Sequence, residues 1–118
     1  MASRHLQLGR DGEDRAARWY AQHGFEILAR NWRTAGGEID LICARGDLLA
    51  IVEVATRWSS AQGQPAGGVT PATQRRLRAL AAQYLAQSRP GTSRIEGHVR
   101  FDVVAIVGTT LEVIEDAF

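Results

Sequence analysis

Lysine is absent from this 118-residue chain, and all 14 of its basic residues are arginine. No position can therefore supply a small, mobile ammonium group. Arginine stays charged when partly buried and binds phosphate oxygens through a planar fork, but its pKa is too high for a general base. A genome rich in G and C would produce the same bias, so the composition alone does not identify a partner.

Other absences narrow the class of protein. The single cysteine, Cys43, excludes an internal disulfide framework and fits a reducing compartment. No apolar run reaches the roughly 20 residues of a membrane span, and the first residues form no apolar signal segment. We therefore expect a cytoplasmic protein without a membrane segment, folded as a single domain over 1–118. The net charge of +1 leaves the kind of partner open.

Hydrophobic periodicity predicts the order helix, three strands, helix and one or two strands. Tight connections between the first three strands favour an antiparallel meander, and the run VVAIV favours a strand covered on both faces. The expected fold class is a mixed α/β sheet between two helices. The expected elements are a helix over 8–23, strands over 25–33, 38–44 and 48–57, a helix from Thr70 to Ser88, and strands over 98–107 and 111–115.

Local signals add detail to this outline. In the strand over 38–44, alternation places Ile39, Leu41 and Cys43 on one face and Asp40 on the other. Thr70 is the expected N-cap of the second helix, and Gly12 is expected to let the first helix pack closely. The segment WSSAQGQPAGGV, residues 58–69, is the longest predicted loop.

Two carboxylates stand out because they occupy strands that otherwise suit a core. Counted outward from Gly46, Asp40 lies six residues back and Glu53 seven residues on, so hairpin pairing brings them close to direct opposition. If both side chains share a face, their repulsion is on the order of 4 kcal/mol at 4 Å in a partly screened site. A proton, an arginine or a divalent cation must then lie between them. The alternative is that one of them points to solvent at a sheet edge.

The strings LGRDGEDRAARW, GFEILARNWR, GGEIDLICARGDLLAIVEVATR and VRFDVVAI, in this order, resemble the YraN-like bacterial family. That family belongs to the resolvase-like branch of the PD-(D/E)XK endonuclease superfamily, beside Holliday junction resolvases. The resemblance implies a restriction-endonuclease-like or resolvase-like fold and a site that binds Mg²⁺ or Mn²⁺. It matches Asp40 to the metal-binding aspartate, Glu53 to the glutamate of the E-x-K motif, and Glu13 to the extra acid of the first helix.

Ala55 occupies the position of the motif lysine, which in the superfamily helps to orient or deprotonate the attacking water. Losing one such electrostatic contact typically reduces turnover by a factor of 10² to 10³. Arg57, one further step along the same strand face, supplies charge but not base chemistry. Three explanations stay open: an inactive relative that still binds, an enzyme with a substitute group, or an engineered substitution.

The sequence therefore predicts a divalent-metal-dependent DNA endonuclease, impaired at Ala55. Its partner would be DNA, branched DNA included, with Arg33, Arg57 and Arg75 at phosphates, and the relatives imply a homodimer by analogy. The first alternative is an inactive nucleic-acid-binding or scaffold protein that keeps the fold. The second is a protein-interaction domain that binds no nucleic acid.

The remaining polar and aromatic residues have plainer explanations. Glu38 is expected to pair with Arg33, and Asp102, amid apolar residues, is expected to make a buried structural hydrogen bond or ion pair. Gln74 is interpreted as a solvated residue, and the tryptophans as core or loop residues rather than base-stacking platforms.

Overall fold

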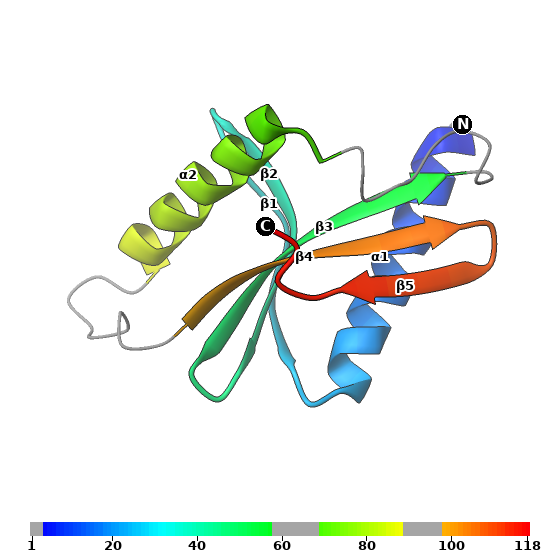
Figure 1. The fold of residues 1–118 in the computed structure, drawn as a ribbon, viewed down its shortest axis with the longest axis horizontal. Coiled ribbons are helices and arrows are strands. Elements are labelled where there is room, and N and C mark those ends of the chain that lie inside the picture. The colour runs from blue at the N-terminus through cyan, green and yellow to red at the C-terminus, as the bar shows by residue number, and fades with distance from the viewer. Residues whose placement is uncertain (1–3, 58–68, 89–97) are drawn as a thin grey trace.

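The protein folds as one five-stranded mixed sheet with a helix on each face, which confirms the predicted fold class (Figure 1). The structure is a computed structural model that describes residues 4–57, 69–88 and 98–118, with only the main chain described for 4–10, Arg57 and Ser88. Its elements are α1 (Arg4–Gln22), β1 (Glu26–Thr34), β2 (Gly37–Arg45), β3 (Leu48–Arg57), α2 (Pro71–Ser88), β4 (His98–Val107) and β5 (Thr110–Ile114).

The strand order is β1-β2-β3-β4-β5. Antiparallel pairing joins β1 to β2 and β2 to β3, as the tight turns predicted, and also joins β4 to β5. The β3–β4 pair is parallel, so the chain must cross over one face of the sheet between them. Helix α2 lies in that crossover, and α1 covers the opposite face (Figure 1).

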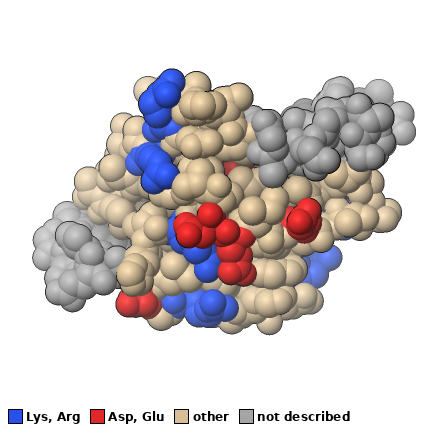
Figure 2. All heavy atoms as spheres, in the orientation of Figure 1, with Lys and Arg blue, Asp and Glu red and all other residues tan. Residues whose placement is uncertain are grey.

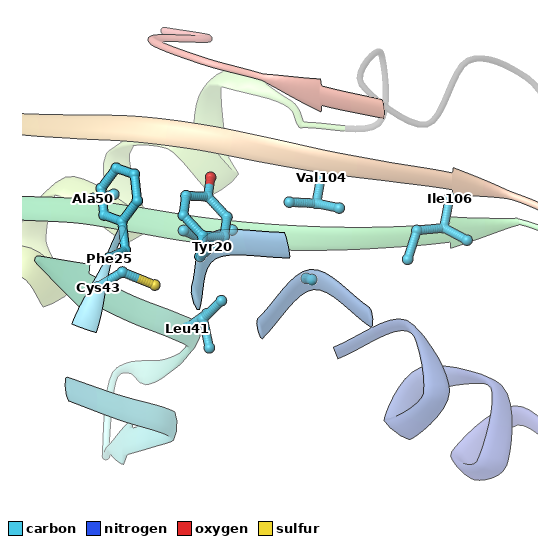
Figure 3. Packing of buried hydrophobic residues seen from close by; sticks show 9 residues of the cluster. Tyr20, Phe25, Leu41, Cys43, Ala50, Val104 and Ile106 are labelled. Carbon is cyan, nitrogen blue, oxygen red and sulfur yellow. The ribbon is translucent and has the colours of Figure 1, made fainter. Parts of the chain in front are cut away.

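The core on the α1 face forms because α1 places small and aromatic side chains on the sheet. Ala16 and Tyr20 are fully buried against side chains of β2, β3 and β4. Figure 3 shows Tyr20 with its hydroxyl directed toward β4, where it donates to Asp102 Oδ2 at 2.6 Å. The buried members of this cluster are Ala16, Tyr20, Phe25, Leu41, Cys43, Ala50, Val52, Val104 and Ile106.

The core on the α2 face contains the predicted apolar stripe of that helix. Leu77, Leu80, Ala81 and Tyr84 are buried against β2, β3 and Phe101 of β4. Because the sheet is buried on both sides, each central strand contains a run of consecutive apolar residues, as the run VVAIV predicted.

One alternation prediction is wrong. Leu41 and Cys43 belong to the cluster on the α1 face, but Ile39 packs in the other cluster with Ile42. The physical reason is that β2 pairs with β3 only as far as Leu41, so the strict two-residue alternation with respect to a flat sheet does not continue to Ile39.

Most predicted element bounds agree with the structure to within one residue. The exception is α1, which begins at Arg4 instead of residue 8, because the preceding arginine, leucine and glutamine are good helix formers. Thr70 caps α2 as predicted, since Thr73 N donates to its Oγ1 at 3.2 Å. The predicted loop 58–69 lies almost entirely outside the described residues. None of the helices in the described ranges is long and apolar enough to span a membrane.

Gly12 allows α1 to approach β3 closely, as predicted. A Cβ at this position would lie 2.7 Å from Thr56 Oγ1 and 3.2 Å from Ile106 Cδ1. Any larger side chain would push the helix away from the sheet. The close packing of α1 on β3 at Gly12 also sets the distance between the sheet and the following residue, Glu13.

Candidate active site at the fork of the sheet

The sheet divides where β2 separates from β3. Their ladder runs from Arg45–Leu48 to Leu41–Val52 and then stops, whereas β2 remains paired with β1 as far as Gly37. Figure 1 shows β1 and β2 turning toward α2 while β3, β4 and β5 continue in another direction. We call the point beyond the Leu41–Val52 pair the fork. The next position on each strand is a carboxylate.

Asp40 and Glu53 meet at the fork, which confirms the predicted opposition. Continuing the register by one step pairs them, and their carboxyl groups share a hydrogen bond. Val54 N donates to Asp40 Oδ2 at 2.8 Å, so a side-chain oxygen replaces a main-chain partner where the strands separate. Ile51 lies on the α2 face, so alternation along β3 places Glu53 on that face, and the hydrogen bond between the two carboxyls brings Asp40 to it.

Both carboxyl groups of this pair resist ionisation. Burial, followed by the charge of Glu53, raises the pKa of Asp40 from 3.8 to about 7, although the Val54 amide opposes the shift. Burial also raises the pKa of Glu53, while the charge of Arg76 and the hydrogen bond from Asp40 oppose that rise. At neutral pH the pair therefore retains a proton that two separate carboxyls would release.

Arg76 brings the positive charge of α2 toward this pair. Its side chain crosses the start of β2, where a Cβ on Gly37 would lie 3.1 Å from Arg76 Cδ and 3.3 Å from Nε. Within the described residues its guanidinium belongs to none of the close ion pairs, and the residue is exposed. A planar guanidinium in this position suits a phosphate group that approaches the fork.

Glu13 reaches the site from α1, on the other side of the sheet. Asn31 Nδ2 donates to Glu13 Oε1 at 3.0 Å, and the charge of Glu13 contributes to the raised pKa of Asp40 after burial and Glu53. Asn31 lies in β1 with a left-handed backbone, φ 52°, at the position that faces Asp40 in the β1–β2 register. A left-handed residue inside a strand is strained, and strain of this kind gathers at functional sites.

Ala55 lies on the same face of β3 as Glu53, two residues further from the turn. It pairs with Ala105 of β4 in the parallel register and is partly exposed. Two facing alanines provide no hydrogen-bond donor and no charge on this part of the sheet. A methyl group thus occupies, beside the acidic pair, the position that the resemblance matches to the motif lysine.

The other predicted phosphate-binding residues differ in how the structure describes them. Arg33 pairs with Glu38 at 3.4 Å, as predicted, and its side chain is 72% exposed. The side chain of Arg57 lies outside the described residues. Arg75 is exposed on α2, next to Arg76. In Figure 2, basic side chains lie on the α2 side of the face in view, and a compact acidic group with basic atoms against it lies toward β5.

Asp102 is a structural residue, as predicted. Its fully buried carboxylate accepts from Tyr20 at 2.6 Å, from the Arg100 guanidinium at 2.8 and 2.9 Å, and from the main-chain N of Asp116 at 3.0 Å. Burial, followed by the Asp102 hydrogen bond, raises the pKa of Tyr20 beyond its usual range. This network ties α1, β4 and the C-terminal segment together on the α1 face, away from the fork.

The remaining polar and aromatic predictions also concern packing. Trp32 packs edge-on against Tyr84, with ring centroids 5.5 Å apart, and Trp19 packs against the α1-face core. The side chain of Gln74 donates to the Val69 carbonyl at 3.2 Å and so is not simply solvated. Trp58 lies outside the described residues.

Sequence reasoning missed Asn31 and did not single out Arg76 among the arginines of the second helix. Asn31 was available as a signal, because asparagine is uncommon inside a strand and tolerates left-handed backbone. Arg76 could not be distinguished from Arg75, since adjacent helix residues point in different directions and only the packing of α2 decides which faces the strands.

The two carboxyl groups at the fork match a metal site that has few protein ligands. In the part of the chain that the structure describes, no three His, Cys, Asp or Glu side chains converge closely enough to hold a metal ion. Mg²⁺, however, commonly binds through one or two carboxylates and keeps several waters or substrate phosphates as its other ligands. The Asp40–Glu53 pair, which retains a proton when no other positive group lies between its oxygens, fits this two-carboxylate arrangement.

Comparison with known proteins gives a consistent family assignment. A UPF0102 protein of Rhodococcus opacus is 48% identical over 97% of this chain and 98% of its own length. A UPF0102 protein of Anaeromyxobacter dehalogenans is 48% identical over 84% of the chain and 71% of its own length, and one of Thermodesulfovibrio yellowstonii is 38% identical over 96% of each. The model of the uncharacterised protein family UPF0102 matches residues 12–106, from Gly12 in α1 to Ile106 in β4, and so includes every acid of the fork. The chain therefore belongs to the UPF0102, or YraN, family.

Proposed function

We propose that the protein binds a divalent cation, Mg²⁺ or Mn²⁺, at the fork and acts on the phosphodiester backbone of DNA, branched DNA included. The observation that carries the proposal is the pair of Asp40 and Glu53, two partly buried carboxyl groups that share a hydrogen bond directly beyond the end of the β2–β3 ladder. A protein gains no stability from such a pair, because burial and mutual repulsion both oppose ionisation. Function explains its presence better than folding does.

Each residue near the fork has a role in this proposal. Asp40 and Glu53 hold the cation. Glu13, carried by α1, does not converge with them closely enough to form a three-ligand group in the described part of the chain, and it would approach as a third carboxylate when the cation binds. Arg76 and Arg75 of α2, together with Arg33 and Arg57, bind phosphate oxygens through charge-assisted hydrogen bonds. A bound divalent cation supplies charge stabilisation at the phosphate and a more acidic water.

The residue that would orient that water is missing. Ala55 offers neither a hydrogen bond nor a charge, and Arg76 is charged but cannot act as a base. The proposed activity is therefore a slow hydrolysis, reduced by about 10² to 10³ relative to a site with the lysine.

A second candidate function is nucleic-acid binding, or a scaffold role, without hydrolysis. It is favoured by Ala55 and by the lack of a three-ligand group among the described side chains. In this case the fork binds phosphate and cation but turns over no substrate. A homodimer that places two forks on one branched molecule would suit either function.

The experiment that separates these functions compares the wild type with Ala55→Lys and with Asp40→Asn/Ala55→Lys. Cleavage of a branched DNA duplex is followed with Mn²⁺, Mg²⁺ or EDTA. We expect Mn²⁺-dependent cleavage by Ala55→Lys, at least about 100-fold faster than by the wild type, and none by the double variant. Asp47→Asn, an exposed residue of the β2–β3 turn, is the control for removing a carboxylate elsewhere.

The outcome is decisive in each direction. If neither the wild type nor Ala55→Lys cleaves, and DNA binding is equal in Mn²⁺ and EDTA, the nuclease proposal fails and the binding function remains. If DNA does not bind at all in low salt, both candidates fail, because phosphate contacts dominate binding to DNA under those conditions.

A further inference from the structure

We infer that Asn31 is a positioning residue that sets the carboxylate of Glu13 toward the fork. This inference rests on the proposed cation site and adds to it a residue that does not itself touch the cation. It concerns the contact between α1 and β1, on which the third carboxylate depends.

The backbone of Asn31 is the first observation. Its φ of 52° places it in the left-handed region, although the surrounding residues continue as strand on both sides. Arg30 pairs with Leu41 and Trp32 pairs with Ile39, so the position across from Asn31 is Asp40. The strained residue therefore stands directly beside the acid of the fork on the neighbouring strand.

The side-chain contact is the second observation. Asn31 Nδ2 donates to Glu13 Oε1 at 3.0 Å, which leaves the other carboxylate oxygen of Glu13 for a second partner. Carboxylates that bind metals are usually held by hydrogen bonds of this kind, and losing such a partner typically weakens metal affinity 10- to 100-fold.

The neighbouring contact shows that Asn31 is not needed merely to attach α1. One residue earlier on β1, Arg30 pairs with Asp14 of α1 at 2.5 Å. Two adjacent residues of β1 thus meet two adjacent residues of α1, and the side chains of the Arg30–Asp14 pair are 40% and 52% exposed. The Arg30–Asp14 pair already attaches the helix, so the left-handed backbone of Asn31 is not needed for attachment and coincides instead with the amide contact to Glu13.

Glycine at position 31 separates backbone from side chain. Asn31→Gly adopts a φ of 52° without strain and removes only the amide that holds Glu13. Affinity for Mn²⁺ is measured by calorimetric titration, and the midpoint of thermal unfolding is measured in EDTA. The same measurements are made on Glu13→Gln, on the double variant, and on Arg30→Gln as the control that breaks the adjacent contact.

We expect Asn31→Gly to bind Mn²⁺ about tenfold more weakly than the wild type, with an unfolding midpoint in EDTA that is unchanged or higher. Arg30→Gln should keep its Mn²⁺ affinity within about twofold. Adding Asn31→Gly to Glu13→Gln should weaken binding no further, because the amide then has no ligand to position.

Other results identify which idea fails. If Glu13→Gln weakens Mn²⁺ binding and Asn31→Gly does not, or if the two effects add, the inference about Asn31 is wrong and the cation site stands. If Glu13→Gln binds as the wild type does, Glu13 is no ligand and the inference also falls, while Asp40 and Glu53 remain. A wild-type protein that binds no Mn²⁺ overturns the proposed function and this inference together.

Discussion

Replacing Asp40 by asparagine should make the protein more stable at alkaline pH, although it removes a buried, hydrogen-bonded carboxylate. An asparagine has nearly the same size, can accept from Val54 N through its oxygen and can donate to Glu53 through its nitrogen. It therefore keeps the contacts and removes the charge. Comparing the variant with the wild type shows how much ionisation of the Asp40 carboxyl lowers the free energy of unfolding.

The magnitude follows from the pKa of Asp40. Burial and the charge of Glu53 raise this pKa from 3.8 to about 7, so the folded protein holds the proton more tightly than the unfolded chain does. The contribution of Asp40 to stability is then greatest below pH 4, falls as pH rises toward 7, and is constant above that value. Each pH unit in this window lowers the free energy of unfolding by about 1.4 kcal/mol. Between pH 5 and pH 8 the free energy of unfolding of the wild type therefore falls by about 3 kcal/mol, whereas Asp40→Asn, which has no proton to lose at this position, does not show this decrease.

The assay is urea denaturation at pH 5, 6, 7 and 8 in EDTA, followed by circular dichroism. The free energy of unfolding of Asp40→Asn minus that of the wild type should increase by about 3 kcal/mol across this range. Asp47→Asn, exposed in the turn of the same hairpin, should show a difference that varies by less than about 0.5 kcal/mol. A difference for Asp40→Asn that stays constant or shrinks with rising pH would refute the argument that the fork opposes ionisation.

Three further outcomes test the fork and the packing around it. Mn²⁺ should raise the thermal unfolding midpoint of the wild type more at pH 8 than at pH 5, since protons compete for the same oxygens, and Asp40→Asn should lose this response. Asp102→Ala leaves the Tyr20 hydroxyl, the Arg100 guanidinium and the main-chain N of Asp116 without their acceptor, and it should lower the free energy of unfolding by about 3 to 5 kcal/mol. Glu115→Ala, which removes a 54% exposed partner of the same arginine, should lower it by less than about 1 kcal/mol. Gly12→Val should lower the free energy of unfolding, measured by urea denaturation, by about 2 kcal/mol or more, because a Cβ there would lie 2.7 Å from the side-chain oxygen of Thr56 in β3. Arg18→Val, on the exposed side of the same helix, should lower the free energy of unfolding by less than about 1 kcal/mol. Equal decreases for the two valine variants would contradict the packing argument.

The fold was largely readable from local patterns. Turn residues and two-residue alternation predicted the three-stranded meander, and a Thr-Pro start predicted the second helix, because these signals act over a few neighbouring positions. The side on which Ile39 packs was not readable, since it depends on β2 leaving β3. The parallel pairing of β3 with β4 likewise depends on where the crossover helix returns the chain.

The site was readable in part, for the same reason. Counting from Gly46 brought Asp40 opposite Glu53, because hairpin register depends only on the turn and the intervening residues. The contributions of Arg76 and Asn31 come from packing between elements distant in sequence. The role of Ala55 as the vacant lysine position still rests on the resemblance and stays a prediction.

The short ladder beneath the fork limits how this hairpin can change in evolution. Five residue pairs separate the carboxylates from the turn, and side chains alternate across each strand. Deleting one residue from either arm would rotate one acid to the opposite side of the sheet and separate the pair. Extra residues inserted at the exposed tip, around Gly46, would leave both acids in place. Homologues should therefore vary in length at that tip far more readily than along either arm.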